Sequence, residues 1–188
     1  MERLAEAVIL PAGPGDDIAL ARVHVDAWRE TYTGLLPRAY LDAMNPRLHA
    51  RRWRTLLSRP RTGEVVLAAE GPAGLVGYCH GASTGREAEV FTLYLLRAAQ
   101  NGGTGRRLLA ATARVLAADG ADRLRIRVLN RNGRARGFYE HLGGRAAGER
   151  AVGGWGGGLV ETCYVWDDIA AVFDPCGSHP QSGGGGPG

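Results

Sequence analysis

Gln100, Gly103 and Gly105 stand in a glycine-rich run at which a chain could bind a phosphate group. The composition of residues 89–96 favours a β-strand before the run, and the apolar spacing of residues 108–116 favours one face of a helix after it. A strand that turns through glycines into a helix presents unpaired backbone N–H groups and the positive end of the helix dipole. The run is therefore a candidate site for a phosphate or pyrophosphate.

Two familiar phosphate-binding motifs do not fit this run. A P-loop needs a lysine after its second glycine, and the chain of 188 residues contains no lysine. A dinucleotide-binding fingerprint needs a third glycine three residues after Gly105, where Leu108 stands. The pattern that remains is Q-x-x-G-x-G, which an ordinary turn between a strand and a helix would also satisfy.

A second chemical feature lies in residues 132–143, which read N-x-x-A-x-x-F-Y-E-x-x-G. The segment follows residues 123–129, where apolar side chains alternate with arginines as in a strand with one buried face. Within it, Ala135, Phe138 and Tyr139 have the spacing of an apolar helix face. A tyrosine hydroxyl is thereby directed toward the interior.

Together, and in this order, the two motifs resemble those of the GNAT superfamily of acetyl-CoA-dependent N-acetyltransferases. Residues 89–95 are similar to the fourth strand of that family and residues 28–37 to its first helix and loop. The resemblance covers most of residues 5–168. It implies an α/β fold with a mixed, largely antiparallel sheet of about seven strands, splayed between strands four and five and flanked by about four helices.

Two positions depart from the family pattern. Gly144 stands where phenylalanine usually follows, which we expect to loosen a hydrophobic anchor after the helix. Arg97 stands where proline is common. Neither change touches the expected chemistry.

The resemblance implies that acetyl-CoA is the acetyl donor and that no metal takes part. Backbone groups freed where the sheet splays would pair with the pantetheine arm, and the amide of Leu95 would donate to the reacting carbonyl. The amides of residues 101–106 would bind the pyrophosphate, with added charge from the Arg106 side chain. The implied cofactor-binding residues are Leu93, Tyr94, Leu95, Gln100, Asn101, Gly102, Gly103, Thr104, Gly105, Arg106, Asn132 and Tyr139.

The same resemblance gives two residues catalytic roles. Tyr139 matches the tyrosine that protonates the departing thiolate, and packing in the core is the alternative role. Glu89 stands where many relatives place a glutamate that acts as a base, and an exposed glutamate at a strand end is the alternative. A chain of water molecules could replace Glu89, and His80 and Glu30 are weaker candidates.

The implied reaction is direct attack of a primary amine on acetyl-CoA in a ternary complex. Trp28 and Tyr32 are expected to bind the acceptor, with Tyr40 nearby, and such aromatic walls favour a small amine. Two alternatives stay open. The acceptor could be an N-terminus or a lysine of a protein, or the chain could be a catalytically silent module that binds acetyl-CoA.

Composition narrows the classes of partner. The formal net charge of +4 comes without a nucleic-acid-binding motif, and no apolar run has the roughly 20 residues that span a membrane. The three cysteines are scattered, which favours free thiols in a reducing cytoplasm. We therefore expect neither a nucleic acid nor a membrane as partner, and a homodimer is an option.

The elements needed to position these residues fit one domain over residues 1–172, followed by a tail over residues 173–188 whose Gly, Pro and Ser content predicts disorder. Asp16 is expected to cap the first helix, and Asn45 followed by Pro46 to start the third. Strands are predicted at 8–10, 65–70, 75–81, 89–96, 123–129, 145–152 and 159–167, and helices at 16–32, 37–44, 45–58 and 132–142, with a further helix after the glycine-rich run that includes residues 108–116.

Overall fold

The computed structural model describes residues 6–153 and 158–173. The strands are β1 (Val8–Pro11), β2 (Glu64–Gly71), β3 (Gly74–Thr84), β4 (Glu87–Leu95), β5 (Arg123–Leu129), β6 (Arg145–Val152) and β7 (Leu159–Trp166). The α-helices are α1 (Asp17–Tyr32), α2 (Arg38–Ala43), α3 (Pro46–Ser58), α4 (Thr104–Ala118) and α5 (Gly133–His141), and short 3₁₀ helices follow at Arg97–Ala99 and Ile169–Val172. Trp155, Cys176 and the tail from residue 174 onward lie outside the described residues.

One seven-stranded sheet organises the described chain, in the order β1-β2-β3-β4-β5-β7-β6. Its neighbouring strands are antiparallel except β4 and β5, which are parallel. The predicted mixed, largely antiparallel sheet is therefore confirmed.

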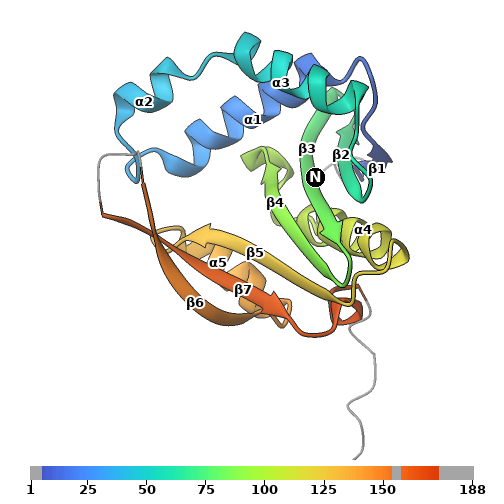
Figure 1. Cartoon of the computed structure of the whole chain (residues 1–188). Coiled ribbons are helices and arrows are strands. Elements are labelled where there is room, and N and C mark those ends of the chain that lie inside the picture. The colour runs from blue at the N-terminus through green and yellow to red at the C-terminus, as the bar shows by residue number, and fades with distance from the viewer. Residues whose placement is uncertain (1–5, 154–157, 174–188) are drawn as a thin grey trace, which may run out of the picture.

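The sheet opens between β4 and β5. Their pairing runs from Glu87 opposite Arg123 to Val90 opposite Ile126 and then stops, although both strands continue. Figure 1 shows β4 and β5 diverging from this point. On the other edge of β4 the pairing with β3 skips Phe91, which forms a bulge that bends the strand. The predicted splay is confirmed.

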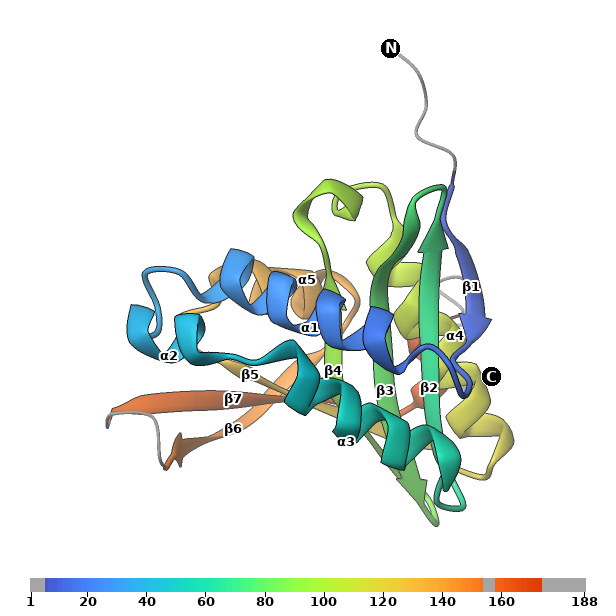
Figure 2. The ribbon, with the colours of Figure 1, turned by 90° about the horizontal axis from the view of Figure 1, so that it is seen from above.

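Helices cover both faces of the sheet, and the strand alternation decides what each face buries. Tyr78 of β3 packs with α1 and α3 in one apolar cluster, whereas the next residue, Cys79, packs with α4 in another. Figure 2 shows α1 and α3 on one side of β2–β4 and α4 on the other. None of these described helices is long and apolar enough to cross a membrane.

The two predicted N-cap residues, Asn45 and Asp16, differ in whether their side chains make the expected hydrogen bond. The Asn45 side chain accepts a hydrogen bond from the Arg47 amide at 2.9 Å, as expected of a cap before Pro46. Asp16 stands at the predicted N-cap position of α1, but the predicted capping bond is wrong, because its carboxylate accepts from the Gly13 amide at 2.8 Å and from no helical N–H. Asp16 therefore closes the preceding turn.

The two departures from the family pattern have structural counterparts. A Cβ at Gly144 would lie 2.7 Å from Cζ2 of Trp166, whose indole donates to the Leu142 carbonyl at 2.8 Å. Trp166 thus provides apolar packing beside Gly144. The Arg97 amide, which a proline would lack, donates to the Glu30 carboxylate at 2.6 Å and links α1 to the end of β4.

Candidate functional site

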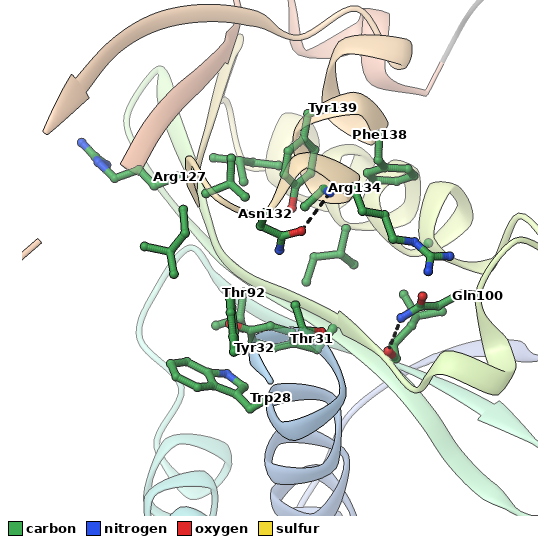
Figure 3. Close-up of a pocket in the computed structure, with 18 of the residues that line it drawn as sticks. Trp28, Thr31, Tyr32, Thr92, Gln100, Arg127, Asn132, Arg134, Phe138 and Tyr139 are labelled. Carbon is green, nitrogen blue, oxygen red and sulfur yellow. Dashed lines mark hydrogen bonds between the residues drawn. The ribbon is translucent and has the colours of Figure 1, made fainter. Parts of the chain in front are cut away.

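A cavity of about 890 Å³ lies where β4 and β5 part, which is a size typical of small-molecule sites. Figure 3 shows Trp28 and Tyr32 on one side of it, Tyr139 on the other, and Asn132 between them. The predicted site residues that line it are Trp28, Tyr32, Leu93, Tyr94, Leu95, Gln100, Asn101, Gly103, Gly105, Arg106, Asn132 and Tyr139. Three predicted residues are not in the lining, namely Gly102, Thr104 and Glu89.

The glycine-rich loop forms one end of the cavity. Gly103 has a φ of +81° and immediately precedes α4, so the first N–H groups of the helix face the loop. Gln100 holds the loop to β4, because its side-chain amide donates to the Leu95 carbonyl at 2.9 Å. This end of the cavity combines free helix amides with the positive end of a helix dipole.

Two arginines add full positive charges at the same end. Arg106 lies in the first turn of α4 and Arg134 in the first turn of α5, and both line the cavity. Arg134 also donates to the Asn101 side chain at 2.8 Å, which connects α5 to the loop. Arg134 is not among the residues predicted from sequence, although its position two residues after Asn132 places it near the helix start. An anionic group such as a pyrophosphate fits this end.

The open edge of β4 supplies hydrogen-bonding groups to the cavity. The Leu96 amide donates to the Val76 carbonyl of β3 at 2.9 Å, and N–H directions alternate along a strand. The amide of Leu95 therefore points away from β3, toward the side from which β5 has departed. A backbone N–H and C=O here can pair with an extended ligand.

Tyr139 brings a protonated hydroxyl to the cavity. Its side chain is buried, with ring contacts to Tyr164 and Trp166. Burial raises the pKa of the Tyr139 hydroxyl above its usual value, so the group carries its proton at neutral pH. Its hydroxyl points into the cavity beside Asn132, whose side chain caps α5 by accepting from the Ala135 amide at 3.1 Å.

The opposite wall comes from α1. The hydroxyls of Tyr32 and Tyr94 lie 3.4 Å apart, and both tyrosines line the cavity together with Asn132. Trp28 packs edge-on against Tyr32, with ring centroids 4.8 Å apart. Burial raises the pKa of Tyr32 and of Tyr94, so this wall stays uncharged at neutral pH.

Glu89 is not in the cavity lining, although its ion-pair partner Arg127 is. Its two carboxylate oxygens accept from Arg125 and Arg127, each at 2.8 Å, because parallel pairing places Glu89 opposite Arg125. The structure therefore brings Tyr139 to the cavity, and it places Glu89 in a pair of ion pairs beside the last rung of the β4–β5 ladder.

The weaker candidates also have structural partners. Glu30 accepts from the Arg97 amide, as described above. His80 lies 3.0 Å from a Glu64 carboxylate oxygen and lines a second, smaller cavity. Across residues 6–153 and 158–173, no group of three or more metal-ligating side chains lies together.

Comparisons with known proteins agree with this geometry. A model of the acetyltransferase (GNAT) family matches residues 24–144. An uncharacterised N-acetyltransferase of Bacillus subtilis, YuaI, is 29% identical over 159 residues, which cover 81% of this chain and 88% of YuaI.

Solved structures with a similar fold include two acetyltransferases with bound ligands. PaiA N-acetyltransferase from Thermoplasma acidophilum, in complex with coenzyme A, has a TM-score of 0.72 at 18% identity and covers 85% of this chain and 97% of its own. YncA from Salmonella typhimurium, with acetyl-CoA, has a TM-score of 0.67 at 17% identity, with 88% and 95% covered.

Proposed function

The chain belongs to the acetyltransferase (GNAT) family, and from this premise we propose that it transfers the acetyl group of acetyl-CoA to a primary amine of a small acceptor. One observation carries the proposal. A single cavity joins a helix N-terminus with two arginines at one end to a protonated tyrosine hydroxyl and an aromatic wall at the other.

In the proposed binding mode, different parts of acetyl-CoA occupy the two ends of the main cavity. The amides of residues 101–106, with Arg106 and Arg134, bind the pyrophosphate through hydrogen bonds and charge. The open edge of β4 at Leu93 and Leu95 pairs with the amide groups of the pantetheine arm. The thioester then lies toward Tyr139 and Asn132.

The reaction begins when the amine nitrogen, freed of its extra proton, attacks the thioester carbon. A C–N bond forms, and the carbonyl oxygen takes up negative charge that the Leu95 amide is placed to stabilise. The nitrogen gives up its second proton to water, the C–S bond breaks, and Tyr139 gives its proton to the departing thiolate and is then reprotonated from solvent. The products are the N-acetylated amine and free CoA.

The acceptor must also lose a proton, because an alkylammonium of pKa about 10.4 has no free lone pair. The predicted routes are Glu89 or a chain of water molecules. Since Glu89 is outside the cavity lining and both its oxygens are occupied, the geometry favours the water route.

The proposal is tested by measuring release of free CoA thiol from acetyl-CoA in the presence of a panel of amines. We expect an acceptor-dependent rate with at least one small amine and a product heavier by one acetyl group in mass spectrometry. Acetyl-CoA binding without transfer to any amine or peptide would instead favour the silent binding module.

A further inference from the structure

A second cavity of about 340 Å³ lies under α1, α2 and α3, against β3 and β4. It shares Trp28 and Thr92 with the main cavity, so the two cavities are neighbours at these side chains, beside the β4 bulge. A molecule in the smaller cavity can therefore extend one end toward the proposed position of the thioester.

Aromatic rings form the walls of this smaller cavity. The ring centroids of His24 and His49 lie 4.4 Å apart, and those of Trp53 and Tyr78 lie 5.0 Å apart. Such walls suit an aromatic or apolar ligand, because contacts between aromatic rings stabilise a complex by more than the buried apolar area alone would.

The described lining of the smaller cavity carries positive charge and no negative charge. No aspartate or glutamate is among the described residues that line the cavity, and Arg52 is the one arginine there. Burial lowers the pKa of His24 to about 3 and lowers the pKa of His49 and of His80, so the three imidazoles are neutral at pH 7. Glu64 is outside the lining, and one of its carboxylate oxygens lies 3.0 Å from Nε2 of His80.

Arg52 is directed at the cavity. It lines the cavity together with His24, His49 and Tyr40, and its positive charge adds to the effect of burial in lowering the pKa of His24 and of His49. Its neighbour Arg54 is paired with Asp17 at 2.7 Å, whereas Arg52 takes part in none of the ion pairs among the described residues. A guanidinium without a carboxylate partner at the edge of an apolar cavity can bind an anion in a bidentate manner.

We propose that the smaller cavity is the acceptor site and that Arg52 selects an amine carrying a carboxylate at the end opposite its nitrogen. The apolar or aromatic body of the acceptor lies between the rings, and the amine reaches the main cavity past Trp28 and Thr92. An acceptor with a second ammonium in place of the carboxylate is repelled. This inference rests on the proposed acetyl transfer for its substrate and on Arg52 for its selectivity.

Three para-substituted benzylamines of similar shape test the selectivity. 4-(Aminomethyl)benzoate carries the anion, 4-methylbenzylamine is uncharged at that end, and 1,4-bis(aminomethyl)benzene carries a second cation. For the wild-type protein we expect kcat/KM to fall in that order, by roughly tenfold at the first step, as for a charge-assisted contact at a partly exposed site. Arg52→Gln should remove the preference for the carboxylate, mainly through KM. Equal or reversed rates in the wild type would overturn the proposal.

A binding measurement tests the site without any turnover. 4-Methylbenzoate has the ring and the anion but no amine, and its binding can be followed by the fluorescence of Trp28 and Trp53, which both line the cavity. We expect roughly tenfold weaker binding to Arg52→Gln than to the wild type. The matched control is Arg51→Gln, since Arg51 is exposed but outside the lining, and it should bind as the wild type does.

No binding to the wild type, equal binding to Arg52→Gln, or the same loss in Arg51→Gln would each refute the assignment. A failure of the proposed acetyl transfer appears elsewhere, as an absence of acetyl-CoA binding in calorimetry, because 4-methylbenzoate binding needs no acetyl-CoA.

Discussion

At the scale of single residues, Tyr139 shows how packing can fix a chemical group in its reactive form. Tyr164 and Trp166 hold the ring, and burial keeps the hydroxyl protonated at the edge of the cavity. The same burial that makes Tyr139 part of the core makes it a proton donor. The two roles proposed for it from sequence are therefore compatible.

Replacement of Tyr139 by phenylalanine separates the hydroxyl from the ring. We expect kcat to fall by on the order of 10²- to 10⁴-fold, because the proton is needed mainly in the transition state. Acetyl-CoA affinity in calorimetry and the melting temperature should change little, since the ring contacts remain. Turnover equal to that of the wild type would show that Tyr139 serves packing alone.

The ion pairs of Glu89 allow a similar separation of roles. Glu89→Gln loses charge-assisted contacts to Arg125 and Arg127, and Glu89 is only partly exposed. We expect a loss of about 1 kcal/mol in the free energy of unfolding, or roughly 2–4 °C in melting temperature, with turnover within about threefold of wild type.

A base would behave differently in that experiment. A fall of 100-fold or more in kcat at an unchanged melting temperature would assign proton removal to Glu89, despite its position outside the cavity lining. Arg123→Gln is a suitable control, because Arg123 pairs with Glu87 on the same two strands and does not line the cavity.

His24 makes the stability of the fold depend on pH. Its pKa is about 3 in the folded protein, against about 6.5 in the unfolded chain, because burial disfavours the charged ring. Below pH 6.5 the unfolded state binds the extra proton, so stability falls as the pH drops from about 6.5 toward 3 and is unaffected above that range.

The size of this effect is measurable by urea unfolding. We expect His24 to contribute a slope on the order of 1 kcal/mol per pH unit between pH 6 and 4, and His24→Gln to flatten the profile there. An identical slope in the variant would mean that other groups carry the acid sensitivity, with His49 and His80 the nearest alternatives.

At the scale of elements, the loop before α4 depends on one backbone conformation. Gly103 has a φ of +81°, which L-residues adopt only at a cost, whereas Gly102 is outside that region. We expect Gly103→Ala to destabilise the fold by about 1–2 kcal/mol and to weaken acetyl-CoA binding, because the loop must shift to relieve the strain. The control variant Gly102→Ala has the same composition as Gly103→Ala, and it should leave the stability of the fold and the affinity for acetyl-CoA nearly unchanged.

Differential scanning calorimetry and titration with acetyl-CoA measure the two effects. Affinity that is equal in the two alanine variants would show that the loop conformation does not matter for the cofactor.

Elements defined by local signals were the ones that the sequence could predict. Asn45 before Pro46 specified a helix start through adjacent residues alone, and alternation along residues 123–129 specified β5. Asp16 stands at the predicted helix start, but its carboxylate can accept either from the first helix amides or from the preceding turn, and it accepts from the Gly13 amide of the turn. Local composition does not decide such a competition.

Contacts between side chains far apart in sequence could not be predicted from the sequence. The pairing of Glu89 with Arg125 follows from the register of two parallel strands, and no local pattern fixes that register. The same holds for the smaller cavity, whose lining combines Arg52 of α3 with His24 of α1. Many lining residues of the main cavity could be named from the family resemblance, because the motifs of the family lie on the elements that form this cavity.

At the scale of the whole molecule, the splay divides the described sheet into two parts that share only the short β4–β5 ladder. The main cavity takes its lining from both parts, with Trp28 and Leu95 on one side and Asn132 and Tyr139 on the other. A ligand that fills the cavity therefore contacts both halves and opposes their separation. Binding should stabilise the fold as a unit rather than a single loop.

This coupling gives a thermal test of the proposed cofactor. At 100 times its dissociation constant, acetyl-CoA should stabilise the protein by about 2.7 kcal/mol, because it binds the folded state only. For a chain of this size that corresponds to a rise of roughly 5–10 °C in melting temperature. Adenosine, which lacks the pyrophosphate and the pantetheine arm, reaches neither the loop nor β4 and should cause little shift. If acetyl-CoA leaves the melting temperature of the well-folded wild type unchanged, the main cavity does not bind it and the proposed reaction fails with it.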